Sequence, residues 1–132
     1  MTIKTKLEKS DIIDTKRYEA IRNNFRKDIV EEKKLRRIAV GPYATFYFES
    51  YNTMWYQVQE MLRIEKGGKE QIIDELLAYN PLIPNGSELV ATLMFEIDNP
   101  DIRTAFLSGL GGVEEQITMG VGEKMITAVP EE

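Results

Sequence analysis

The sequence contains neither cysteine nor histidine. Without thiolates the chain cannot supply a Cys nucleophile, a redox CxxC pair, a thiolate-ligated zinc site or an iron–sulfur cluster. Without imidazole it cannot supply a serine triad, a His-ligated haem or histidine acid–base chemistry near neutral pH. A metal could bind only through carboxylates, which favour hard cations such as Mg²⁺, Ca²⁺ or Mn²⁺. We therefore predict no metal site and no cofactor of the chain's own.

Long apolar runs are missing as well. No segment approaches the ~18–20 apolar residues that span a bilayer, and the first 14 residues hold no apolar run typical of a signal peptide. We expect a cytoplasmic protein without membrane contacts. The 132 residues are 42% hydrophobic, which suits one globular domain over residues 1–132 with flexible residues 1–9.

The charge is unevenly distributed. The net charge is -5, but residues 1–40 hold 12 Lys and Arg against 7 acids, and the remainder holds 5 against 15. The acidic total argues against nucleic-acid binding. The basic first segment is either a contact face for an acidic partner or a solvated helix paired with its own body. The second interpretation is favoured because charge runs are usually solvated.

The hydrophobic periodicity predicts an α+β fold. Apolar residues at three- and four-residue steps predict helices over residues 15–35, 54–66, 69–79 and 100–110. The predicted N-caps include Thr15, Asn52 or Thr53, and Asn99. Alternation and turn residues predict strands over residues 36–49 (a hairpin around Gly41), 88–97 and 113–129 (a closing hairpin). The order α-β-β-α-α-β-α-β-β indicates a single domain with a mainly antiparallel sheet of about five strands and about four helices packed on it.

A group of arginines is the first candidate site. Guanidinium groups suit phosphate and carboxylate because two parallel donors match two oxygens. Arg22 and Arg26 are four residues apart on the first helix and therefore adjacent. Glu60 and Arg63 lie with Gln59 outside the apolar face of the second helix. The anion-binding candidates are Arg22, Arg26, Arg36, Arg37, Glu60 and Arg63. The favoured alternative is that each arginine pairs with a nearby carboxylate such as Glu19, Glu60 or Glu65.

The carboxylates do not predict a catalytic pair or a cation site. Glu60 and Glu65 are five residues apart on a helix and point about 140° away from each other. Glu88 and Glu96 share a strand face but are roughly 27 Å apart along it. Together with Glu49, these acids are expected to be solvated or paired with arginines.

An apolar loop stiffened by two prolines is the second candidate site. It could line a pocket or dock a partner, or it could be a lid on the core, and the sequence favours neither. The candidate residues are Trp55, Tyr79, Asn80, Pro81, Leu82, Ile83 and Pro84.

Several segments strongly resemble a bacterial family catalogued as domain of unknown function 3501. They are YEAIR at 18–22, RRIAVGP at 36–42, FE at 48–49, QVQEMLRIE at 57–65, YNPLIP at 79–84 and ELVATL at 88–93. The resemblance covers nearly the whole chain in the expected order. The resemblance implies a gene that lies beside genes for rubrerythrin-type proteins and iron–sulfur oxidoreductases. This gene neighbourhood implies a link to peroxide or redox metabolism. The resemblance implies no activity, cofactor or catalytic residue.

These features favour a non-catalytic binding or accessory module that serves a redox or peroxide-stress system through protein contacts. The expected partner is a rubrerythrin-type protein or an iron–sulfur oxidoreductase, and a homodimer is compatible with the sequence. The alternative is an enzyme or sensor that binds a small anionic ligand in a cleft lined by Arg and Glu. Any redox centre would have to come from the partner or from a bound organic cofactor.

Overall fold

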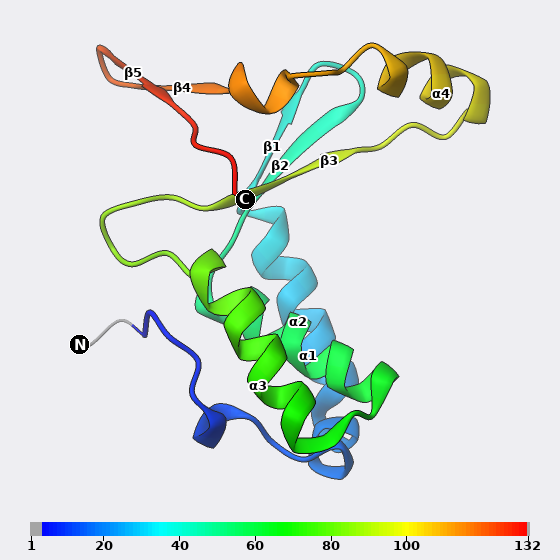
Figure 1. Ribbon diagram of the computed structural model, residues 1–132, viewed down its shortest axis with the longest axis vertical. Coiled ribbons are helices and arrows are strands. Elements are labelled where there is room, and N and C mark those ends of the chain that lie inside the picture. The colour runs from blue at the N-terminus through cyan, green and yellow to red at the C-terminus, as the bar shows by residue number, and fades with distance from the viewer. Residues whose placement is uncertain (1–3, 132) are drawn as a thin grey trace. The chain divides into compact units, whose positions relative to one another are not determined.

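The structure is a computed structural model that describes residues 4–131. It consists of two compact units, the first ending at Glu96 and the second beginning at Ile97 (Figure 1). The first unit contains η1 (Lys9–Asp11), α1 (Thr15–Lys34), β1 (Arg37–Val40), β2 (Ala44–Phe48), α2 (Tyr51–Glu65), α3 (Gly68–Tyr79), η2 (Asn80–Leu82) and β3 (Ala91–Phe95). The second contains α4 (Pro100–Ser108), η3 (Val113–Glu115), β4 (Thr118–Val121) and β5 (Lys124–Thr127).

The predicted α+β class and the order of helices and strands are confirmed. The five strands form two antiparallel sheets, one of three strands in the order β1-β2-β3 and one of two strands, β4-β5. The tight β1–β2 connection is possible because Gly41 adopts φ 67°, a conformation that side chains disfavour. None of the described helices is long and apolar enough to cross a membrane.

Two of the predicted helix caps are wrong by one to three residues. The side chain of Asp14 accepts a hydrogen bond from the Arg17 amide, so Asp14 caps α1 instead of Thr15. Ser50 and Thr53 form a reciprocal pair of capping hydrogen bonds that start α2 at Tyr51. The prediction for the fourth helix is confirmed, because the Asn99 side chain accepts from the first amides of α4.

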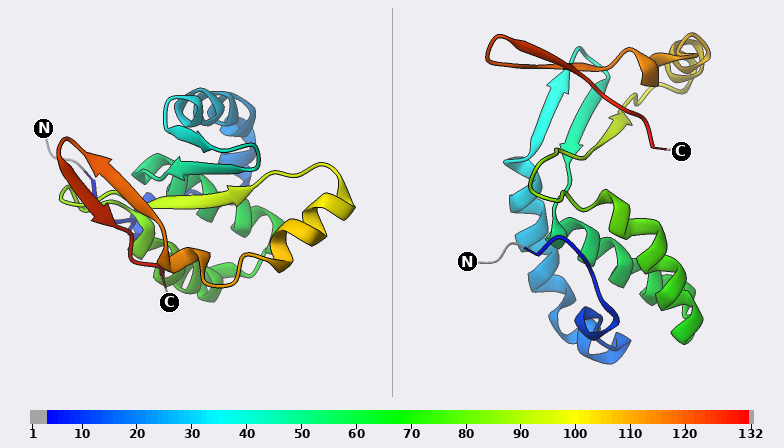
Figure 2. Two further views of the ribbon diagram at one scale, coloured as in Figure 1. Left: turned by 90° about the horizontal axis from the view of Figure 1, so that it is seen from above. Right: turned by 60° about the vertical axis from the view of Figure 1, so that its left-hand side comes forward.

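The hydrophobic core lies among the helices. In Figure 1 and in the right view of Figure 2 the helices α1, α2 and α3 run alongside one another. The buried side chains come from the segment before η1, from α2 and α3, and from the loop after α3: Leu7, Met54, Val58, Leu62, Leu76 and Ile83. Leu7, from the segment for which flexibility is expected, is only 1% exposed.

A cluster of aromatic rings joins α1 to α2. Phe25 meets Trp55 edge to face with ring centroids 4.7 Å apart and stacks on Tyr56 at 6.1 Å. Tyr18 lies 5.8 Å from Trp55, also edge to face. Such pairs contribute about 0.5–1.5 kcal/mol each beyond their burial, so this cluster fixes how the two helices pack.

Gln59 is buried, and its predicted place outside the apolar face of α2 is wrong. Its side chain is almost fully enclosed, accepts a hydrogen bond from the Ile13 amide at 2.9 Å and donates to the Ile13 carbonyl at 3.2 Å. The chain before α1 would otherwise leave two backbone groups unpaired next to the core.

Candidate functional site

The carboxylate of Glu60 binds both Arg22 and Tyr18. Arg22 donates Nε–H to Glu60 Oε2 at 2.9 Å and Nη2–H to Oε1 at 2.8 Å. The hydroxyl of the fully buried Tyr18 donates to Oε2 at 2.5 Å. Less than a fifth of each side chain of the Arg22–Glu60 pair is exposed. Arg22 thus binds Glu60 in the bidentate geometry in which an arginine would also bind the carboxylate of a ligand.

The electrostatics of this cluster match its hydrogen bonds. The Arg22 guanidinium, and then the Tyr18 hydroxyl, hold the pKa of Glu60 below its usual value despite partial burial. Burial, and next the hydrogen bond to Glu60, raises the pKa of Tyr18, which stays protonated. The hydrogen bonds that Arg22 itself donates to Glu60 raise the pKa of Arg22. Glu60 is therefore held ionised, and Tyr18 and Arg22 are held protonated.

The other predicted arginines are spread over the first unit. Arg63 pairs with Glu19, and Arg36 lies 3.9 Å from Glu32. Arg26 is exposed on α1 near Tyr56. Burial raises the pKa of Tyr56, and the positive charge of Arg26 opposes this rise. Arg22, Arg26 and Arg63 therefore lie around Glu60 and Tyr56, whereas Arg36 lies in the turn after α1 and Arg37 lies in β1.

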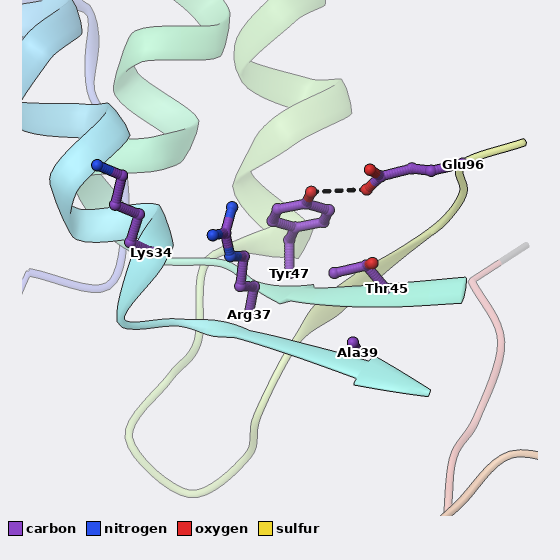
Figure 3. A pocket seen from close by; sticks show the side chains of 6 residues that line it. All are labelled: Lys34, Arg37, Ala39, Thr45, Tyr47 and Glu96. Atoms are coloured by element: carbon purple, nitrogen blue, oxygen red, sulfur yellow. Dashed lines mark hydrogen bonds between the residues drawn. The ribbon is translucent and has the colours of Figure 1, made fainter. Parts of the chain in front are cut away.

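Arg37 lines a pocket on one face of the three-stranded sheet. The volume is about 420 Å³, and the lining residues are Lys34, Arg37, Ala39, Thr45, Tyr47 and Glu96 (Figure 3). The Tyr47 hydroxyl donates to Glu96 at 2.7 Å. Lys34 pairs with the exposed Glu31 on its own helix. Sequence reasoning missed Lys34, Thr45 and Tyr47, although alternation along a paired hairpin would place Tyr47 and Thr45 beside Arg37 and Ala39.

Of the acids considered from sequence, Glu49 is the buried one. Its oxygens accept hydrogen bonds from Thr53 at 3.0 Å and Thr92 at 2.6 Å, which ties α2 to β3. No group of three acidic side chains that could hold a metal ion occurs among residues 4–131.

The loop containing the second candidate site is fixed to the core. The Asn80 side chain accepts from the Leu7 amide at 2.7 Å and donates to the Leu7 carbonyl at 3.0 Å. Ile83 is buried, and Tyr79 and Leu82 pack against the core. Trp55 donates its indole N–H to the Asp11 carbonyl at 2.8 Å. Pro81 is exposed and Pro84 is half-buried.

A groove with apolar walls runs beside this loop. Its volume is about 340 Å³, and it is lined by Lys6, Leu7, Glu8, Lys9, Ile73, Leu76, Leu77 and Asn80. Leu77 is 71% exposed and Ile73 is 42% exposed, so α3 presents apolar side chains both to the core and to the groove. The sequence signal was present, because Ile72, Ile73, Leu76 and Leu77 form an arc wider than one buried stripe needs.

Comparisons with known proteins agree on an uncharacterised family. A crystal structure of a protein of unknown function from Burkholderia pseudomallei is similar, with 35% sequence identity and a TM-score of 0.87 over 93% of this chain and 71% of that chain. Comparison with curated proteins finds no match. The family model described as "Protein of unknown function (DUF3501)" matches residues 6–132. The chain therefore belongs to this family, as the sequence motifs predict.

Proposed function

We propose that this chain is a non-catalytic binding module that holds a protein partner in the groove between residues 6–9 and α3. The observation that supports this proposal most is the exposure of Leu77 and Ile73 in that groove, which the buried core residue Leu76 also lines. Exposed apolar side chains that line a depression are typical of interaction sites.

The ion pairs of the arginines support a role without catalysis. Arg22, Arg36 and Arg63 each lie against a carboxylate of the protein. An anionic substrate would have to displace these carboxylates, and at Arg22 it would leave the partly buried Glu60 without its counter-charge. Binding through the apolar groove requires no such exchange.

The groove defines the chemistry of the partner. Lys6 and Lys9 line it together with the single acid Glu8, so its rim is positive on balance. It suits a segment with an apolar side chain flanked by acidic residues, and its affinity should fall as salt screens the lysines. The family resemblance adds the proposed setting, which is a bacterial cytoplasmic redox or peroxide-stress system. The proposed partner is a rubrerythrin-type protein or an iron–sulfur oxidoreductase.

The test is affinity capture from a lysate of the source bacterium with three baits. Wild type is compared with Leu77→Asp in the groove and with Leu35→Asp, a matched change at a leucine that is 90% exposed and outside the groove. We expect wild type and Leu35→Asp to retain an oxidoreductase of the proposed class, and Leu77→Asp to lose at least about tenfold of it, which is about 1.4 kcal/mol. Equal capture by Leu77→Asp, or capture of no such protein by wild type, contradicts the proposal.

A small anion is the second candidate ligand, favoured by the pocket around Arg37. Arg37 and Lys34 supply two positive charges there against the one carboxylate of Glu96, and Thr45 and Tyr47 add hydroxyls, of which that of Tyr47 donates to Glu96. Phosphate should then raise the melting temperature of wild type and of Arg36→Ala, and should leave Arg37→Ala unchanged. A wild-type protein that phosphate does not stabilise rules out this candidate.

A further inference from the structure

The loop between η2 and β3 contains an asparagine that is followed directly by a glycine. Asn85, Gly86 and Ser87 are all exposed. Gly86 adopts φ 97° and has open space where a Cβ would lie, which is a backbone conformation that glycine adopts most readily. Because Gly86 has no side chain, its amide nitrogen is open to the side chain of Asn85 that precedes it.

The side-chain carbonyl of Asn85 accepts two hydrogen bonds from Ser87. The Ser87 amide donates to Asn85 Oδ1 at 2.9 Å, and the Ser87 hydroxyl donates to the same oxygen at 2.8 Å. Two donors on one carbonyl oxygen withdraw electron density from its carbon and stabilise the negative charge that the oxygen acquires when a nucleophile adds to that carbon. Ser87 therefore activates Asn85 Cγ toward nucleophilic attack.

We propose that Asn85 is a site of self-modification, at which Ser87 assists attack by the Gly86 nitrogen and the amide becomes a carboxylate. The Gly86 nitrogen adds to Asn85 Cγ and loses its proton to a solvent base, so that a new N–C bond forms. The Cγ–Nδ2 bond then breaks, and Nδ2 takes up a proton and leaves as ammonia. Water opens the resulting succinimide ring at either carbonyl, which gives aspartate or isoaspartate. The reaction consumes only water and releases only ammonia.

The five other asparagines of the sequence lack this arrangement. Proline follows Asn80 and Asn99, so the nucleophilic N–H group is missing there. Asn23, Asn24 and Asn52 lie inside α1 and α2, where the hydrogen bonds of each helix and its cap hold the amide that follows. These five residues are internal controls, and the reaction is confined to Asn85.

The modification changes both the charge and the backbone of the loop. Each conversion adds a carboxylate, which is ionised at neutral pH, to a chain whose net charge is already -5. The isoaspartate product also brings the Cβ of residue 85 into the main chain between Ile83, which is buried, and β3. This proposal goes beyond the partner groove, because none of the residues that line the groove belongs to this turn. Failure of the modification leaves the proposed function testable by partner capture.

The test is to incubate the folded wild type at neutral and mildly alkaline pH and to follow each asparagine by peptide mapping with mass spectrometry. We expect Asn85 to gain the mass difference between an amide and an acid, in both aspartyl and isoaspartyl peptides. The rate should rise with pH, because the Gly86 nitrogen must lose its proton to a base. The other asparagines should remain unchanged over the same time. A wild type that keeps Asn85, or that converts Asn23 or Asn52 equally fast, would overturn the proposal.

Two substitutions at Ser87 separate the effect of the folded turn from that of the Asn–Gly pair alone. Ser87→Ala removes the hydroxyl donor and should slow the conversion by roughly threefold to tenfold, as the loss of one hydrogen bond predicts. Ser87→Thr keeps a hydroxyl and should react at nearly the wild-type rate. In concentrated urea, which unfolds the turn, all three proteins should react at the same rate. Equal rates of wild type and Ser87→Ala in the folded state, or a difference that persists in urea, would also overturn the proposal.

Discussion

Replacing Glu60 by Gln tests whether the Tyr18–Arg22–Glu60 cluster is structural. The amide has nearly the shape of the carboxylate, but it has one acceptor oxygen in place of two and no charge. Glu60 accepts two hydrogen bonds from Arg22 and one from Tyr18. The variant must therefore lose at least one of these bonds, and it leaves Arg22 without its counter-charge.

The expected loss follows from the number and exposure of these bonds. A hydrogen bond to a charged group contributes about 1.5–3 kcal/mol. The Glu60 side chain is 16% exposed, so solvent screens part of this contribution, and we expect Glu60→Gln to lower the free energy of unfolding by about 2 kcal/mol. For a chain of this length the melting temperature should fall by about 6 °C.

Urea unfolding followed by the fluorescence of Trp55 is a suitable assay. Trp55 is the single tryptophan of the chain and touches Tyr18 in the folded state. The control is Glu31→Gln, which breaks the exposed pair with Lys34 and should change stability by less than about 0.5 kcal/mol. If both variants lose the same small amount, the cluster does not stabilise the fold and our account of Glu60 is wrong.

The pH dependence gives a second readout of the same cluster. The pKa of Glu60 is lowered in the folded state from its ordinary value of 4.5, chiefly by the hydrogen bond from Arg22. Its contribution is therefore fully present above about pH 4.5 and is lost as the pH falls through the lower folded pKa. The stability difference between wild type and Glu60→Gln should be constant near neutral pH and shrink in acid. A difference that grows in acid contradicts this sign.

Three further substitutions should each change the free energy of unfolding, which urea unfolding measures. Asn80→Ala removes both hydrogen bonds to the backbone of buried Leu7 and should destabilise by about 2–3 kcal/mol; a loss below about 0.5 kcal/mol contradicts this. Gly67→Ala puts a Cβ 2.6 Å from Gln71 Oε1 and 2.8 Å from its Cβ, so a loss of about 1–2 kcal/mol is expected, and unchanged stability would show that Gln71 moves freely. Lys66→Gly relieves a positive φ of 55° at the end of α2 and should stabilise by about 0.5 kcal/mol, whereas destabilisation contradicts the expected relief.

The sequence was sufficient for the elements because their signals are local. The alternation from Ala91 to Phe95 has period two, and the helices have period 3.6, so each can be recognised without its neighbours. The helix cap at Asn99 and the turn at Gly41 could be predicted for the same reason. The cap of α2 was misplaced because three polar residues, Ser50, Asn52 and Thr53, lie near the start of that helix and Thr53 takes part in the cap from inside the helix.

The sites could not be predicted because they depend on residues far apart in the chain. Glu60 is 38 residues from Arg22, and Asn80 is 73 residues from Leu7. The sequence predicts Gln59 outside the apolar face because nothing within α2 indicates that the Gln59 side-chain amide binds the backbone of Ile13. The groove was missed because periodicity shows which residues are apolar and not which of them remain exposed.

The most direct measurement of the central claim is partner capture by wild type, Leu77→Asp and Arg37→Ala in parallel. The proposed function depends on the apolar groove beside α3, and the second candidate depends on the positive pocket of the sheet. We predict that wild type and Arg37→Ala retain a redox partner and that Leu77→Asp loses it. Retention by Leu77→Asp together with loss by Arg37→Ala would contradict the account.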